Sequence, residues 1–85
     1  MAAYSVVIRR SAEKEIARLP DATRRLIVHR IRALGDEPRP HGSQKLSGRE
    51  GYRIRQGEYR VVYTIDDAHR VVTVVRVAHR SDVYR

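Results

Sequence analysis

The segment GYRIRQGEYRVVYTI, from Gly51 to Ile65, constrains the fold more than any other part of the chain. Apolar and charged side chains alternate along it, and a glycine interrupts it near the middle. This pattern predicts two strands joined by a two-residue turn at Gln56-Gly57, with the glycine at the position that needs a positive φ. The predicted cross-strand pairs are Tyr52 with Val61, Arg53 with Arg60, Ile54 with Tyr59, and Arg55 with Glu58.

The predicted hairpin has one apolar and one basic face, because successive side chains of a strand point to opposite sides of the sheet. We expect the apolar face to be buried, and Arg53, Arg55 and Arg60 to share one exposed face. The apolar face carries Tyr52, Ile54, Tyr59, Val61, Tyr63 and Ile65, and the basic face carries Arg53, Arg55, Glu58, Arg60 and Val62.

The basic face is unusual because it sets Arg53 directly opposite Arg60, with Arg55 nearby. Like charges across a ladder destabilise a sheet. Guanidinium groups match the geometry of phosphate oxygens, so an anionic ligand explains such a cluster. The alternative, which the sequence leaves open, is a solvated face that Glu58 partly neutralises.

The length and net charge of the chain limit the kinds of molecule that it is expected to bind. The chain has 85 residues, enough for one domain, and a net charge of +8. A domain this basic usually meets nucleic acid, an acidic protein or an anionic membrane. No apolar run approaches the ~20 residues of a membrane span, and the N-terminus does not resemble a secretory signal. The expected location is therefore the cytoplasm.

The sequence predicts no metal site and no cofactor. The chain has no cysteine, which excludes a disulfide framework and a thiolate metal site. Its four histidines do not stand beside acids at the spacing of metal ligands.

The N-terminal half is expected to form a strand and two helices. Residues 4–9 are β-branched and predict a strand. Ser11 is the predicted N-cap of a first helix, which Pro20 is expected to end or kink. A second helix is predicted to begin at Asp21 or at Pro20 itself and to run to about Leu34, with Gly35 as its stop. Its predicted apolar stripe is Leu26, Ile27, Ile31 and Leu34.

The segment from Asp36 to Gly51 is predicted to be irregular. Its two prolines and three glycines argue against any regular element. Loops of this length are more often functional than idle in a compact domain. Lys45 and Arg49 make its far end basic.

Residues 70–78, RVVTVVRVA, predict a strongly β-branched third strand of a meander. The sequence leaves open which alternate set faces the core. If Val71, Thr73, Val75 and Val77 do so, Arg76 lies on the basic face near Arg60. A polar tail, residues 79–85, follows this strand.

The order of these elements carries a resemblance to a known family. The segments that carry this resemblance are AEKEIARLPDATRRLIVHRI, KLSG, YRIR, EYRVVYTID and the terminal HRSDVY. Together they resemble the RelE/ParE superfamily of small bacterial toxins from type II toxin–antitoxin modules, and its RelE branch in particular. The resemblance implies a single α+β domain over residues 1–85. In it, an N-terminal strand and a helical hairpin precede a three-stranded antiparallel meander, and the helices pack on one face of a four-stranded sheet.

The resemblance also implies an activity. RelE-like toxins are metal-independent endoribonucleases that cleave messenger RNA on the ribosome and so inhibit translation. The message's own 2′-hydroxyl attacks the adjacent phosphate. A cognate antitoxin protein holds such a toxin silent, and no small-molecule cofactor or membrane is involved.

Candidate catalytic and RNA-binding residues are those at which this sequence matches the motifs of the family. Arg53 and Arg55 fall where the family often has lysines, and Arg60 falls on the arginine of its GYR-type element. Arginine is a poor general base, so Arg55 departs from members whose lysine moves protons. His79 is a candidate on the grounds of its intrinsic pKa of ~6.5. The predicted catalytic residues are Arg55, Arg60, His79, Arg80 and Tyr84, and the predicted RNA-binding residues are Lys45, Arg49, Arg53, Arg55 and Arg76.

Two other functions remain open at this point. The ParE branch shares the fold but inhibits DNA gyrase through a protein–protein contact. A plain basic module would bind RNA through phosphates without turnover. The retained Arg60, Arg80 and Tyr84 favour the nuclease.

Overall fold

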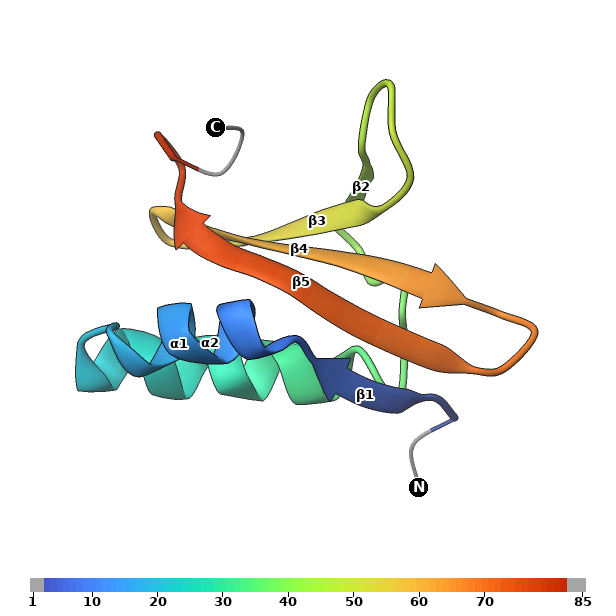
Figure 1. The fold of residues 1–85 in the computed structure, drawn as a ribbon, viewed down its shortest axis with the longest axis horizontal. Coiled ribbons are helices and arrows are strands. Elements are labelled where there is room, and N and C mark those ends of the chain that lie inside the picture. The colour runs from blue at the N-terminus through green and yellow to red at the C-terminus, as the bar shows by residue number, and fades with distance from the viewer. Residues whose placement is uncertain (1–2, 83–85) are drawn as a thin grey trace.

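The computed structural model describes residues 3–82, in which two helices lie against one face of a twisted sheet (Figure 1). No helix in this range is long and apolar enough to cross a membrane. The elements are β1 (Ser5–Ile8), α1 (Arg10–Ala17), α2 (Asp21–Ala33), β2 (Gln44–Lys45), β3 (Tyr52–Gln56), β4 (Tyr59–Asp66) and β5 (Val71–His79).

The sheet has five strands in the order β1-β5-β4-β3-β2. β1 runs parallel to β5, and the other neighbours are antiparallel. The α+β class and the placement of both helices on one face are confirmed, but the prediction of four strands is wrong. The fifth strand, β2, pairs Gln44 with Arg53 and Lys45 with Tyr52, inside the segment predicted to be irregular. Two residues are too few to show a periodic pattern.

The β3–β4 hairpin forms, but its register differs from the prediction by two residues. The turn is Gly57-Glu58, and Gly57 takes the positive φ of 59°. A shift of two residues keeps every side chain on its predicted face, because the side-chain period of a strand is two. The observed pairs are Tyr52 with Tyr63, Arg53 with Val62, Ile54 with Val61, Arg55 with Arg60, and Gln56 with Tyr59.

A β-bulge at Val75 settles which side of β5 faces the core. Tyr63 pairs with Val74, whereas the neighbouring Val62 pairs with Arg76, so Val75 is an extra residue in β5. Even-numbered residues of β5 are therefore buried before the bulge, and Val77 is buried after it. Neither of the two predicted alternations holds along the whole strand.

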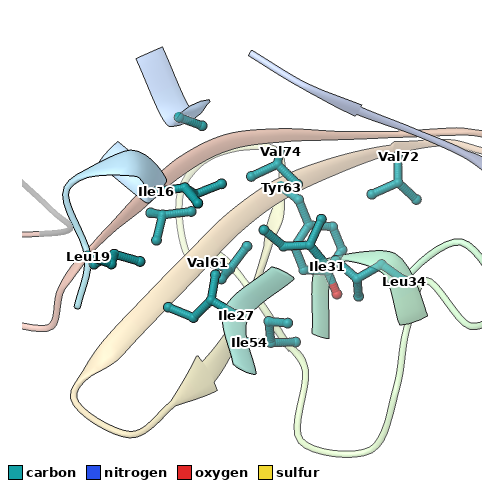
Figure 2. Close-up of a cluster of buried hydrophobic side chains, with 12 residues drawn as sticks. Ile16, Leu19, Ile27, Ile31, Leu34, Ile54, Val61, Tyr63, Val72 and Val74 are labelled. Atoms are coloured by element: carbon teal, nitrogen blue, oxygen red, sulfur yellow. The ribbon is translucent and has the colours of Figure 1, made fainter. Parts of the chain in front are cut away.

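The core lies between α1, α2 and the sheet. In Figure 2, Ile27 and Ile31 of α2 point toward Val61 and Tyr63 of β4. Leu26, which was predicted to belong to the same stripe, is 53% exposed. Burying each large aliphatic side chain contributes about 1.5–3 kcal/mol. The fully buried large side chains are Tyr63, Ile27, Ile31, Leu34, Ile54, Val61, Val72, Val74 and Val77.

Helix α1 begins directly from the sheet. The Arg9 N–H donates to the Val74 carbonyl at 3.0 Å, which extends the β1–β5 ladder by one bond. Arg9 is also the N-cap and makes no side-chain cap bond, so the predicted cap at Ser11 is wrong. Of the two predicted starts of α2, the structure has Asp21, with Pro20 as the N-cap, and the last helical residue is Ala33.

The side chain of Glu15 covers the part of β5 that β1 does not reach. The Val77 N–H donates to its Oε1 at 2.8 Å. The other carboxylate oxygen lies 3.5 Å from Nε of Arg76. One acid of α1 thus satisfies a strand donor and pairs with a cation of the same strand.

Tyr63 fixes the segment that follows α2. Its ring is fully buried, and its hydroxyl donates to the Pro38 carbonyl at 2.7 Å. Next to it, Arg39 pairs with Asp67 at 2.9 Å and donates from Nε to the Tyr52 hydroxyl at 3.1 Å. Burial raises the pKa of Tyr63 to about 12.

We expect Tyr63→Phe to lower the free energy of unfolding by about 1 kcal/mol at pH 7, because the buried Pro38 carbonyl loses its donor. The ionised phenolate is disfavoured in the folded state, so this contribution is fully present below pH 10 and is lost as the pH rises from about 10 to about 12. Urea unfolding between pH 7 and 11.5 measures both effects. Tyr59→Phe, at a half-buried ring, is the matched control. An equal alkaline loss in wild type and Tyr63→Phe would contradict this assignment.

Candidate functional site

The candidate site is the open face of the sheet, the side turned away from the helices (Figure 1). Arg53 and Arg55 reach this face from β3, and Arg60 reaches it from β4. We call these three residues the arginine face. The hairpin pattern therefore predicted the right side chains on the right face.

The arginine face is not uniformly exposed. Arg55 is exposed and Arg53 is half-buried, but Arg60 is only 9% exposed, against the prediction of three exposed arginines. Arg60 is buried because β4 is a central strand, with β3 on one side and β5 on the other. The register sets Arg55 rather than Arg53 directly across from Arg60.

A small apolar cluster forms the floor next to the arginine face. Leu46 and Val62 are buried there, and Val75 and Ala78 pack against them. The Leu46 N–H donates to the Gly51 carbonyl at 2.9 Å, which closes a loop that projects from the sheet on the open side (Figure 1). Gly51 has a φ of 126°, and a Cβ there would lie 3.1 Å from the Tyr63 carbonyl oxygen. Glycine is thus required where this loop returns to the sheet.

Two adjoining hollows lie beside the arginine face. The first has a volume of about 400 Å³ and includes Lys45, Arg49 and Arg53 in its lining. The second has a volume of about 330 Å³ and includes Arg30, Arg53 and Arg55. Gln44 and Arg53 line both. The predicted RNA-binding residues Lys45, Arg49, Arg53 and Arg55 are therefore brought together.

Arg80 is held at the tip of the β3–β4 hairpin. Its N–H donates to the Glu58 carbonyl at 2.7 Å, and its Nε lies 2.8 Å from Oε2 of the same residue. Both side chains are largely exposed. Glu58, considered above as the acid that neutralises the arginine face, thus pairs with Arg80 instead.

His79 lies on the other side of the sheet from the arginine face. It pairs with Tyr59 across the β4–β5 ladder, and the two rings meet edge to face at 5.7 Å. Its Nδ1 accepts from the Ser81 N–H at 3.3 Å and lies 2.9 Å from the Ser81 hydroxyl. The structure therefore does not bring His79 together with Arg55 and Arg60.

The remaining predicted residues differ in their placement. Arg76 is opposite Val62 on the open side, but its Nε turns to Glu15 at the sheet edge. Tyr84 lies outside the described residues. Among residues 3–82, no three histidine, aspartate or glutamate side chains lie close enough together to hold a metal ion.

Sequence reasoning missed two polar side chains that line the second hollow, those of Arg30 and Gln44. No feature of the sequence singled out Arg30, and Gln44 lies in the segment predicted to be irregular. No local pattern marks either one, because each reaches the hollow through packing between distant segments. Knowledge that β2 pairs with β3 would have found Gln44, which lies opposite Arg53.

Comparison with known proteins agrees with this fold. The family described as the ParE toxin of type II toxin–antitoxin system, parDE, matches residues 6–84. Toxin RelE of Mycobacterium tuberculosis (strain ATCC 25618 / H37Rv) is 36% identical over 84 residues, covering 96% of this chain and 87% of that protein. Toxin RelG of the same organism is 35% identical over 88 residues, covering 96% of this chain and 97% of that protein.

Solved structures of toxins from the same family have a similar fold. The toxin–antitoxin complex RelBE2 of M. tuberculosis contains a chain that matches with a TM-score of 0.81 and 30% identity, over 92% of this chain and 99% of that one. The isolated E. coli RelE toxin matches with a TM-score of 0.79 and 31% identity, over 96% of this chain and 92% of that one. The class of protein is thus a toxin of a type II toxin–antitoxin module. This chain belongs to the RelE/ParE toxin family.

We expect Arg55→Gln to stabilise the fold, because it removes one of two like charges that face each other across the ladder. The expected gain is about 0.2–1 kcal/mol at low ionic strength, and it should shrink as added salt screens the repulsion. Chemical denaturation at two salt concentrations measures it. Arg49→Gln removes the same charge from a loop residue outside the ladder and should leave stability nearly unchanged. Equal effects of the two variants would contradict the pairing.

Proposed function

We propose that this chain is a ribosome-dependent endoribonuclease that cleaves messenger RNA. The observation that carries the proposal is the arginine face, where Arg55 and Arg60 are kept directly opposite each other despite their repulsion. A folded protein that tolerates this cost gains from it when an anion lies between the charges. The phosphates of an RNA strand supply such an anion.

In the proposed reaction the 2′-oxygen of the message attacks the adjacent phosphorus. The P–O5′ bond breaks, which leaves a 2′,3′-cyclic phosphate upstream and a 5′-hydroxyl downstream. One proton leaves the 2′-hydroxyl, and one is taken up by the departing 5′-oxygen. The protein must align the strand and stabilise the charge that grows on the phosphate.

The arrangement suggests a division of roles. Arg60 is buried in a central strand, so its guanidinium is held rigidly and is suited to stabilise the reacting phosphate. Arg53 and Arg55, together with Lys45 and Arg49, hold the RNA backbone. Arg80 adds a fork of donors at the end of the hairpin.

Tyr84 is proposed, from the resemblance alone, to orient a nucleotide. His79 takes no part in proton transfer in this mechanism, because its ring packs against Tyr59 on the helix-covered face.

A cognate antitoxin is the proposed protein partner. Two relatives by fold, the M. tuberculosis RelBE2 and E. coli RelBE toxins, were solved as toxin–antitoxin complexes. An acidic antitoxin would complement the net charge of +8 on this chain.

The second candidate function is inhibition of DNA gyrase. The observation that favours it is the matching family's description, which names a ParE toxin. A gyrase inhibitor that acts by protein contact has no need for arginines paired across a sheet. Purified protein added to a translation reaction and to a supercoiling reaction separates the two functions. Codon-phased message cleavage supports the nuclease, loss of supercoiling supports the inhibitor, and RNA binding without either effect supports a simple binding module.

We expect binding to programmed ribosomes to weaken steeply with salt, because phosphate contacts release counterions. The double variant Arg53→Ala/Arg55→Ala should flatten the slope of log K against log salt by about one per lost contact. Arg25→Ala/Arg32→Ala, which removes two exposed arginines of α2, is the matched control and should leave the slope unchanged. An unaltered slope in the first variant would show that the arginine face is not the binding face.

We expect cleavage to require the 2′-hydroxyl at the cut site. A single 2′-deoxy substitution there should block it, and the upstream fragment should end in a 2′,3′-cyclic or 3′-phosphate. Arg60→Ala and Arg80→Ala should each lower the single-turnover rate by ~10²-fold or more, with smaller effects on binding. Arg60→Lys should recover part of the rate. Circular dichroism confirms that each variant is folded, and a 3′-hydroxyl product would rule out this mechanism.

A further inference from the structure

The second hollow extends the basic surface beyond the sheet. It lies at the β3 edge of the arginine face and takes part of its wall from α2. Its volume is about 330 Å³, and its lining consists of Arg30, Gly42, Gln44, Arg53 and Arg55. Three of these five residues carry a guanidinium, and none is an acid.

Arg30 is fixed in this hollow by hydrogen bonds to β3. Its Nη1 donates to the Arg55 carbonyl at 3.1 Å and to Oε1 of Gln56 at 3.2 Å. A guanidinium has five N–H donors, so Nε and Nη2 can still donate to a ligand. A long side chain that is already ordered loses less conformational entropy when it binds.

Arg53, which also lines this hollow, is held by a hydrogen bond to β2. Its Nη2 donates to Oε1 of Gln44, the residue that pairs with it across the β2–β3 ladder. Since Gln44 and Arg53 also line the larger hollow, basic groups follow one another from Arg49 of the loop to Arg30 of the helix. Two preordered guanidiniums facing one small space without a carboxylate suit a tetrahedral oxyanion.

We propose that this hollow is a binding subsite for an RNA phosphate, with Arg30 as a binding residue and Gln44 as the residue that positions Arg53. The inference deepens the proposed function, on which it rests. The RNA backbone then continues past the sheet edge onto α2. The phosphate comes either from the message or from the ribosome, because both offer the same phosphodiester.

The test measures binding to empty ribosomes and to ribosomes programmed with a message that carries a 2′-deoxy residue at the cut site. Arg30→Gln removes the charge and keeps an amide donor for the Arg55 carbonyl. The control is Arg32→Gln, which removes an exposed arginine two residues away on the same helix. We expect Arg30→Gln to flatten the slope of log K against log salt by about one, Arg32→Gln to leave it unchanged, and Arg30→Lys to restore most of it.

The arms of the experiment separate the possible outcomes. A smaller slope only on programmed ribosomes assigns the phosphate to the message, and a smaller slope on both assigns it to the ribosome. Equal slopes for Arg30→Gln and Arg32→Gln on both would overturn the subsite. A slope that depends on Arg30, without any cleavage by the wild-type chain of the unmodified message, would refute the proposed nuclease and leave the subsite standing.

Discussion

The extra residue at Val75 is the constraint on which both faces of the sheet depend. A regular β5 that kept Val72 and Val74 in the core would also turn Arg76 toward the helices, where its charge would be costly to bury. The bulge resets the alternation by one residue. Val77 then returns to the core, while Arg76 stays on the open side. One irregularity thus allows a single strand to complete the core and the floor of the candidate site.

The open face concentrates repulsion in the middle of the sheet. Arg60 is nearly buried and faces the exposed Arg55 across the ladder, so one of the two like charges is largely withdrawn from water. The nearest acid on the hairpin, Glu58, is held by Arg80 at the tip. The large apolar core on the opposite face of the same strands offsets this cost. The molecule thereby keeps positive charge at a rigid position, which is more useful for holding a phosphate than charge on mobile side chains.

The residues on each face of the hairpin were predictable from the sequence. Side chains alternate between the two faces with a period of two residues, so a register that is wrong by two residues still assigns each side chain to the correct face. The helical hairpin was predictable from spacing and from Pro20. The fifth strand, the bulge at Val75 and the burial of Arg60 were not, because each results from tertiary pairing with no local pattern. For the same reason the alternation predicted the arginine face but neither Arg30 nor the separation of His79 from it. The family was recognisable from the order of elements, and the role of Tyr84 comes from that resemblance alone.

The position of Glu15 affects whether the edge of β5 can pair with a strand of another molecule. A strand edge with free N–H groups is a template for a strand of another molecule, and a five-stranded sheet with a short first strand would offer one along β5. Glu15 occupies the Val77 N–H and places a carboxylate against that edge. An incoming strand would have to displace this bond and bury the charge. Intermolecular strand exchange and aggregation are thereby discouraged along this part of β5, and the outer sides of β1 and β2 remain as the places where the sheet can be extended.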